Sequence, residues 1–244
     1  MKSRYSPCPK CRAKGNDTSG DNLVHFQDGG AHCYACGYHE FGNKIPQQLK
    51  KEIFNVPKNL LAFDFTREVP AAALKWLLQY GLPWSYWKDQ IGYSPTEERL
   101  IFQVGKPMQF SIGRYVGNSV PAPRKWYVWG DPHRHCEVVG SGKTIVLVED
   151  LISAHKIAAS CPDVEAIPLF GVELHKPHMY CLLNENKPVV FWLDKDQQGS
   201  IMRKAMRLQA LTGRAVSVVS TERDPKELTR EELNENLRHV GSST

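Results

Sequence analysis

Apolar and polar positions form regular blocks along residues 144–219, and these blocks predict the elements of an α/β sheet. Two short apolar, β-branched runs, 144–148 and 189–193, are bounded by polar residues, which is typical of strands buried on both faces of a parallel sheet. Further strands are expected at 165–170 and 215–219, and helices at 151–160, 174–183 and 201–211. Strands that alternate with helices in this way predict a doubly wound parallel sheet.

A smaller α+β region is expected ahead of this sheet, in residues 59–139. Apolar residues at helical spacing predict a helix over 71–80 that stops at Gly81, and a second short helix is expected at 84–90. Three strands are expected at 99–104, 109–115 and 125–129. The polar stretch 41–58 predicts a connector with one short helix at 47–52.

Carboxylates follow both buried runs of the predicted sheet. Glu149 ends the first run, and Asp194 and Asp196 end the second. In an open α/β sheet the ligand crevice lies beyond the carboxyl ends of the strands, so these three side chains are expected to converge. They would repel one another unless a cation lay among them, and oxygen-only ligands suit Mg²⁺ or Mn²⁺. The sequence therefore predicts a divalent-metal site for phosphate chemistry.

Asp224 follows the last predicted strand and is a candidate fourth ligand of this site. The alternative is that Asp224 caps the N-terminus of the final helix.

Two Cys-x-x-Cys pairs near the N-terminus predict a metal site of another kind. Their thiolates can close a tetrahedral site for one structural Zn²⁺, with the ligands Cys8, Cys11, Cys33 and Cys36. Three nearby histidines are alternative ligands, but four cysteines already complete a closed site. The other three of the seven cysteines are scattered, which favours a reducing cytoplasm over a disulfide framework.

Basic and aromatic residues surround the cysteines and favour contact with single-stranded DNA. Lys10, Arg12 and Lys14 supply charge for phosphates, while His32 and Tyr34 supply rings and donors for bases. The excess of Lys and Arg lies before residue 144, because residues 144–244 carry twelve Lys/Arg against fourteen Asp/Glu. A polyanion held by the first part and processed by the second would fit this distribution. A purely structural zinc ribbon is the alternative.

Gly140 to Thr144 has part of a nucleotide-binding P-loop, but the chain has Glu137 where that motif requires Gly. The segment also runs directly into a predicted strand and not into a helix, so a P-loop is rejected and a flexible joint is expected. No apolar run is long enough for a signal peptide or a membrane span. We therefore expect no membrane partner and a cytoplasmic location, in the host cytoplasm if the protein is viral.

Two groups of residues carry a resemblance to a known family. Glu149 followed by Asp194-x-Asp196-x-x-Gly199 resembles the TOPRIM domain of DNA primases, topoisomerases and some nucleases, although Ser153 stands where the family often has Asp. Ahead of it, the Arg-led strand at Arg99, the pair Gly113-Arg114 and Lys125-Trp126 resemble the basic subdomain of bacterial and phage DNA primases of the DnaG type. Arg124 replaces the Pro that usually precedes the Lys.

The resemblance divides the chain into four parts, namely a zinc-ribbon DNA-binding domain at 1–44, a linker at 45–58, a basic subdomain at 59–139 and a TOPRIM catalytic domain at 140–244. It implies a phage-type DNA primase without a fused helicase, which makes short RNA primers from NTPs on single-stranded DNA by two-metal nucleotidyl transfer. Arg99, Arg114 and Lys125 would hold template phosphates or the incoming nucleotide. A replicative helicase and a polymerase are the implied partners.

The resemblance also makes Glu149 a candidate general base, a role that the sequence does not separate from metal binding. Two other functions share parts of this pattern. One is a TOPRIM nuclease, which has the carboxylates but needs no basic subdomain. The other is a noncatalytic, zinc-dependent factor that binds or loads single-stranded DNA.

Overall fold

The computed structural model describes residues 4–26, 30–33, 35–40 and 64–241, without the side chains of 39, 196, 198 and 239–241. The chain forms two compact units, residues 1–55 and 56–244, and each is described by itself. Tyr34 and the helix expected at 47–52 lie outside the described residues. Among the described helices, none has the length and apolarity needed to cross a bilayer.

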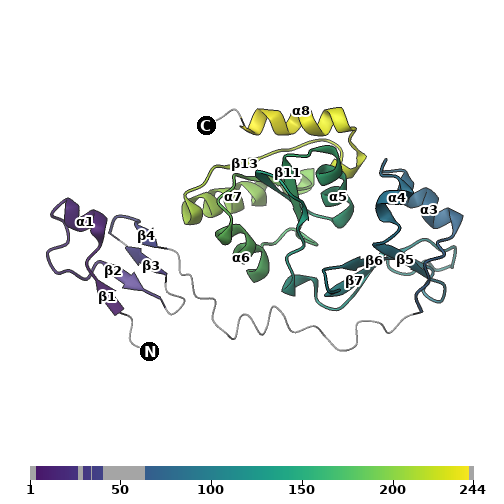
Figure 1. The fold of residues 1–244 in the computed structure, drawn as a ribbon, viewed down its shortest axis with the longest axis horizontal. Coiled ribbons are helices and arrows are strands. Elements are labelled where there is room, and N and C mark those ends of the chain that lie inside the picture. The colour runs from purple at the N-terminus through teal and green to yellow at the C-terminus, as the bar shows by residue number, and fades with distance from the viewer. Residues whose placement is uncertain (1–3, 27–29, 34, 41–63, 242–244) are drawn as a thin grey trace. The chain divides into compact units, whose positions relative to one another are not determined.

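The first unit is a small antiparallel sheet with one short helix (Figure 1). Its strands pair in sequence order, and its elements are β1 (Arg4–Ser6), α1 (Pro9–Ala13), β2 (Leu23–His25), β3 (Ala31–Cys33) and β4 (His39–Glu40). Among the described residues of this unit, the buried core contains three of the four cysteines together with Leu23 and Ala31. Because so few apolar residues are buried, such a unit requires another source of stability.

The described part of the second unit contains, first along the chain, two helices and an antiparallel meander. Its strands pair in sequence order, and its elements are α3 (Ala71–Leu78), α4 (Trp84–Trp87), β5 (Ile91–Ser94), β6 (Arg99–Val104), β7 (Phe110–Tyr115) and β8 (Trp126–Trp129). Gly81 follows the first helix with φ +78°, a left-handed conformation that suits glycine at a helix end. The inner face of the sheet packs on both helices through residues that include Leu77, Trp87 and Phe102.

A five-stranded sheet follows, with the strand order β13-β12-β10-β11-β9. Its strands are β9 (Val139–Gly140), β10 (Thr144–Val148), β11 (Val164–Pro168), β12 (Val189–Trp192) and β13 (Val216–Val218), all parallel except β9 at one edge. Its helices are α5 (Leu151–Ser160), α6 (Lys176–Asn184), α7 (Gln198–Thr212) and α8 (Arg230–Gly241). Short 3₁₀ turns occupy Pro132–Arg134, Lys195–Gln197 and Pro225–Glu227.

Helices cover both faces of this sheet. One core joins the strands to α5 and α8, and a second core joins the opposite strand faces to α6 and α7. The chain first winds from β10 to β11, then crosses to β12 on the other side of β10, so the direction of winding reverses between β10 and β12. The doubly wound sheet expected from the sequence is therefore present, with an added antiparallel edge strand.

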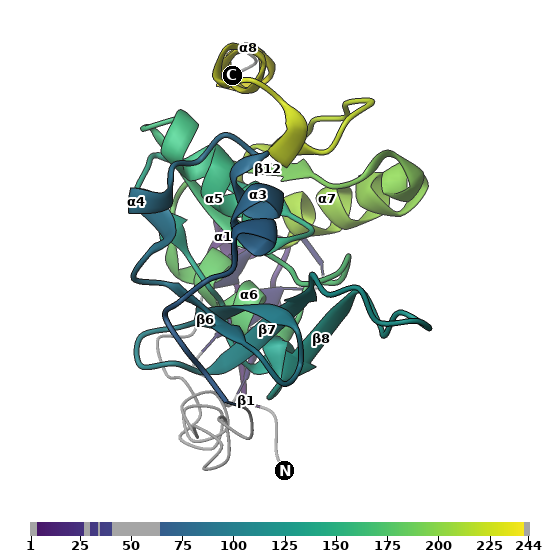
Figure 2. The same cartoon turned by 90° about the vertical axis from the view of Figure 1, so that its right-hand side faces the viewer.

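Helix α5 joins the sheet to the meander within the second unit (Figure 2). Leu151 and Ile152 enter the core of the meander, and the Tyr86 hydroxyl lies 2.8 Å from Nδ1 of His155. Burial lowers the pKa of His155 to about 4, so this ring is neutral at physiological pH. These contacts make one compact unit of two sheets, and the boundary expected after residue 139 stays a prediction.

The segment expected to be a flexible joint is instead held against the sheet edge. Gly140 belongs to β9 and pairs with Glu165 of β11. It has φ +84°, and a Cβ atom there would lie 2.9 Å from Cβ of Ala158, while a Cβ on Gly142 would collide with the backbone of Asp163. Close packing therefore accounts for both glycines, without any phosphate-binding role.

Candidate functional site

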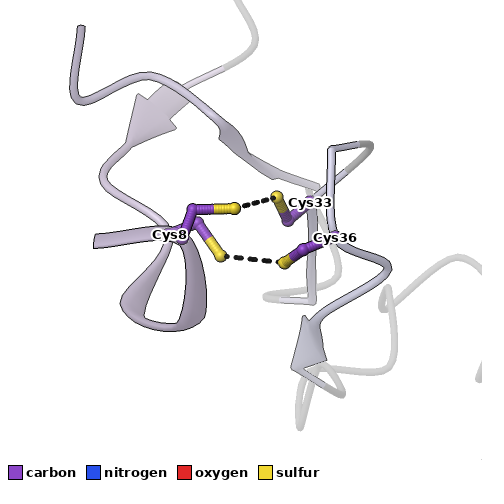
Figure 3. A group of neighbouring side chains, drawn as sticks. Cys8, Cys33 and Cys36 are labelled. Atoms are coloured by element: carbon purple, nitrogen blue, oxygen red, sulfur yellow. Dashed lines mark hydrogen bonds between the residues drawn. The ribbon is translucent and has the colours of Figure 1, made fainter. Parts of the chain in front are cut away.

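The four cysteines of the first unit bring their sulfur atoms together. Cys8 precedes α1, Cys11 lies within it, and Cys33 and Cys36 lie at the end of β3 and in the following turn. The Sγ atoms of Cys8 and Cys36 are 3.5 Å apart and those of Cys11 and Cys33 are 3.7 Å apart, and all four lie within 4.8 Å of one another. Figure 3 shows the labelled side chains of Cys8, Cys33 and Cys36 turned toward a common centre.

This arrangement fits one zinc ion. Tetrahedral bonds of about 2.3 Å from zinc to sulfur require sulfur atoms about 3.8 Å apart, which is close to the observed spacing. A hydrogen bond with Cys36 raises the pKa of Cys11 to about 12, and burial raises the pKa of Cys8. The backbone N–H of Tyr38 lowers the pKa of Cys36 to about 7. A divalent cation would supply the positive charge that four crowded thiolates require.

The face of the first unit opposite the cysteines presents a row of side chains. Tyr5, Val24 and His32 lie side by side across three strands, while Leu23 and Cys33 face the core. The Tyr5 side chain is 61% exposed and His32 is half-buried. The histidine expected to touch DNA therefore lies on the same face of the sheet as an exposed aromatic ring, with Val24 between them.

In the second unit, two of the expected carboxylates lie at the carboxyl-terminal ends of neighbouring central strands of the parallel sheet. Val148 of β10 pairs with Trp192 of β12, so Glu149 and Asp194 follow neighbouring strands at nearly the same level. The direction of winding reverses between these two strands, and the carboxyl ends of the strands at such a point are the usual position of the ligand crevice. The backbone of Asp196 belongs to the turn Lys195–Gln197, and its side chain lies outside the described residues.

Among the side chains that the structure describes, the cysteines are the one group of three or more candidate ligands whose atoms come within 4.8 Å. Because the Asp196 side chain is outside that description, the carboxylate site stays a prediction. Its donors are carboxylate oxygens at a crevice edge, which is the chemistry that Mg²⁺ or Mn²⁺ requires.

Asp224 and Asp150 share a lysine. The Nζ atom of Lys226 lies 2.6 Å from Asp224 and 3.0 Å from Asp150, whose carboxylate also accepts hydrogen bonds from the N–H groups of Ile152 and Ser153 at the start of α5. Burial acts to lower the pKa of Lys226, but the two carboxylates outweigh it and raise that pKa.

The alternative role for Asp224, capping the last helix, is wrong. Thr229 accepts a hydrogen bond from the N–H of Glu232, and the Glu232 carboxylate accepts one from the N–H of Thr229. This reciprocal pair is the capping box of α8, so the cap lies five residues after Asp224.

Replacing Lys226 with Met is expected to lower the free energy of unfolding by about 1–3 kcal/mol, because it leaves two partly buried carboxylates without their shared cation. Urea unfolding of the wild type and the variant measures the change. Lys226→Arg should recover part of the loss. A Met variant as stable as the wild type would show that the bridge contributes nothing.

Arg99 is buried, with 3% of its surface exposed. Its guanidinium donates hydrogen bonds to the carbonyl of Gly113 at 3.2 Å and to that of Arg124 at 2.8 Å. Arg99 therefore stabilises the backbone of residues 124 and 125 through these hydrogen bonds. The phosphate contact implied by the resemblance stays a prediction for Arg99, and Arg114 and Lys125 are the more exposed cations of this region.

Those cations line a cavity of about 420 Å³ beside the meander. Lys125 is exposed, and the guanidinium of Arg114 lies over the rings of Trp76 at 5.0 Å and Trp126 at 5.7 Å. Charge beside flat aromatic rings is the combination that binds phosphates and bases. The sequence indicated the cations, but not Trp76, which α3 contributes from far along the chain.

The described structure thus combines a four-cysteine unit with an antiparallel meander and a parallel α/β sheet whose crevice edge carries carboxylates. Solved primase structures have a similar fold. The zinc-binding and RNA polymerase domains of Aquifex aeolicus primase match 98% of this chain and 80% of that chain, with 15% identity and a TM-score of 0.54. The Escherichia coli primase catalytic core matches 69% of this chain and 72% of its own, with 16% identity and a TM-score of 0.52.

The RNA polymerase domain of Mycobacterium tuberculosis primase DnaG, in complex with a double-stranded DNA oligomer with a 6-nucleotide overhang, is also similar. It matches 71% of this chain and 73% of its own, with 13% identity and a TM-score of 0.51. At these identities the likeness defines the fold. No family model and no curated protein matches the sequence.

Proposed function

We propose that this chain is a DNA primase of the bacterial and phage type, which makes short RNA primers from NTPs on a single-stranded DNA template. The observation that supports the proposal is the register of β10 and β12, because Glu149 and Asp194 follow these two neighbouring strands. The similarity of the fold to primase RNA polymerase domains supports the same conclusion.

In this proposal Glu149, Asp194 and Asp196 hold Mg²⁺ or Mn²⁺. When bound, such ions bind the triphosphate, ease deprotonation of the attacking 3′-hydroxyl and stabilise charge on the leaving pyrophosphate. Asp224 stays a candidate fourth ligand, and in this structure its carboxylate lies 2.6 Å from Nζ of Lys226, which it shares with Asp150. Glu149 is a ligand or the general base.

The cations of the meander position the substrates. Arg114 and Lys125 would bind phosphates of the template or of the nucleotide, and Arg99 keeps Lys125 in place through the backbone. Catalysis would rest on positioning and electrostatics, as in other phosphoryl transfers.

The zinc unit would hold the template. Zinc would fix the fold of a unit with a very small core, and the exposed Tyr5, on the same sheet face as His32, offers a ring on which a base can stack. The M. tuberculosis neighbour, an RNA polymerase domain, was solved with a DNA oligomer that has a 6-nucleotide overhang, which supports DNA as a ligand of the second unit. A replicative helicase and a polymerase would act beside the primase in the cytoplasm.

Incubation of the protein with single-stranded DNA, labelled NTPs and Mg²⁺ tests the proposal. A primase produces short labelled oligoribonucleotides, and their synthesis requires the single-stranded DNA template, the NTPs and Mg²⁺. A TOPRIM nuclease would degrade the template, and a loading factor would bind it unchanged. Either of the last two results, without labelled RNA, would overturn the proposal.

A further inference from the structure

An apolar cavity of about 270 Å³ adjoins Glu149 in the second unit. Trp126 and Val128 of β8 form one wall, and Phe170, which follows β11, contributes to another. Trp126 and Val128 are 37% and 38% exposed, so both side chains are accessible to a ligand. Glu149 and Asp150 are the charged residues among those that line it.

The backbone near Phe170 is held in a costly conformation. Phe170 has φ +54°, a left-handed value that residues with a large side chain rarely adopt, and Gly171 follows with φ +145°. The N–H of Gly171 donates to the carbonyl of Glu149 at 3.3 Å, and the Phe170 ring packs edge-on against Phe110 at 4.9 Å. These contacts hold Phe170 close to Glu149, whose carboxylate is expected at the metal site.

We propose that this cavity binds the base of the nucleoside triphosphate whose phosphates lie at the carboxylate edge, an inference that rests on the proposed function. The ring of Trp126 supplies the stacking surface. A nucleotide is the ligand class that needs an apolar aromatic pocket for one end and a metal-bearing carboxylate edge for the other. The cavity is also at the small end of ligand pockets, so it suits one ring system and not a peptide helix.

Trp126 links this cavity to the cationic one. Its ring contacts Trp76 at 5.8 Å and lies beneath the guanidinium of Arg114, and both of these residues line the second cavity. A base stacked on Trp126 therefore lies beside cations that can hold the template strand. The apolar cavity is therefore assigned to the base of the nucleotide, and the cationic cavity to the template strand.

The test uses adenosine as a phosphate-free probe of the full chain, and its binding is measured by saturation-transfer NMR and by titration. The binding of ATP is measured in the same way, with and without Mg²⁺. Adenosine without metal should receive saturation mainly at its base protons. Trp126→Ala should weaken adenosine binding about tenfold, the usual size of one base-stacking contact. Trp126→Phe should keep most of the binding. Tyr127→Ala, on the opposite face of the same strand, is the matched control and should bind like the wild type.

Val128→Trp is a second variant at an exposed position, and it should block adenosine by filling the cavity. If circular dichroism shows that Trp126→Ala is unfolded, adenosine binding by Val128→Trp tests the pocket instead. A short single-stranded DNA should not displace adenosine, and displacement would assign the pocket to a template base and overturn the proposal. Adenosine binding that is absent, or unchanged in both Trp126→Ala and Val128→Trp, would also overturn it.

Asp194→Asn separates this inference from the proposed function, because Asp194 is an expected metal ligand and is not among the residues that line the cavity. The variant should bind adenosine normally but lose the gain that Mg²⁺ gives to ATP. If adenosine requires Trp126 while ATP gains nothing from Mg²⁺ in the wild type, the base pocket stands and the metal site fails. If ATP gains from Mg²⁺ but Trp126 has no effect, the metal site stands and the pocket fails.

Discussion

Asp194→Asn is expected to abolish primer synthesis, with a loss of at least about a hundredfold in rate. The change keeps the shape of the side chain but removes the charge that a divalent ion requires at the end of β12. The melting temperature should change little, because the mutation removes repulsion between neighbouring carboxylates and creates no cavity. Labelled NTP incorporation on single-stranded DNA and a thermal melt measure the two effects.

The matched control for this variant is Glu222→Gln. Glu222 follows β13 in the chain, its side chain is 80% exposed, and it pairs with Lys195. Loss of this surface charge should leave synthesis near the wild-type rate. Retained synthesis in Asp194→Asn would remove Asp194 from the site.

Cys36→Ser is expected to release zinc and to reduce primer synthesis, while divalent-ion binding at the carboxylates persists. Serine does not replace a thiolate ligand, and a structural zinc ion contributes about 10–16 kcal/mol to the folding of a small domain at neutral pH. The first unit has few buried apolar residues to compensate for that loss. The carboxylates belong to the other compact unit, so their metal affinity should not depend on zinc.

Mass spectrometry of metal content checks the zinc prediction. Cys181→Ser is the control, because Cys181 lies on α6 in the second unit and should leave zinc content unchanged. Unchanged zinc content in Cys36→Ser would show that the ligand set is wrong.

The parts of the fold that could be predicted are those with strong local patterns. The strands at 99–104 and 144–148 and the helix at 151–160 have the predicted bounds, because each combines a buried apolar run with clear polar ends. The strands β5 and β9 were not predicted. Both are short, contain glycine, and form through pairing with strands elsewhere in the chain.

The candidate site divides in the same way. The cysteine cluster could be predicted because two short motifs carry all four ligands. The bridge from Lys226 to Asp150 could not, since it joins residues that are 76 positions apart. Burial of Arg99 also depends on where the backbone of residues 124 and 125 passes, which no local pattern specifies.

Manganese binding, followed by electron paramagnetic resonance, tests the central claim most directly. The wild type should bind Mn²⁺, Asp194→Asn and Glu149→Gln should each lose most of that affinity, and Cys36→Ser should retain it. Equal Mn²⁺ binding by the wild type and both carboxylate variants would contradict a metal site at the ends of β10 and β12.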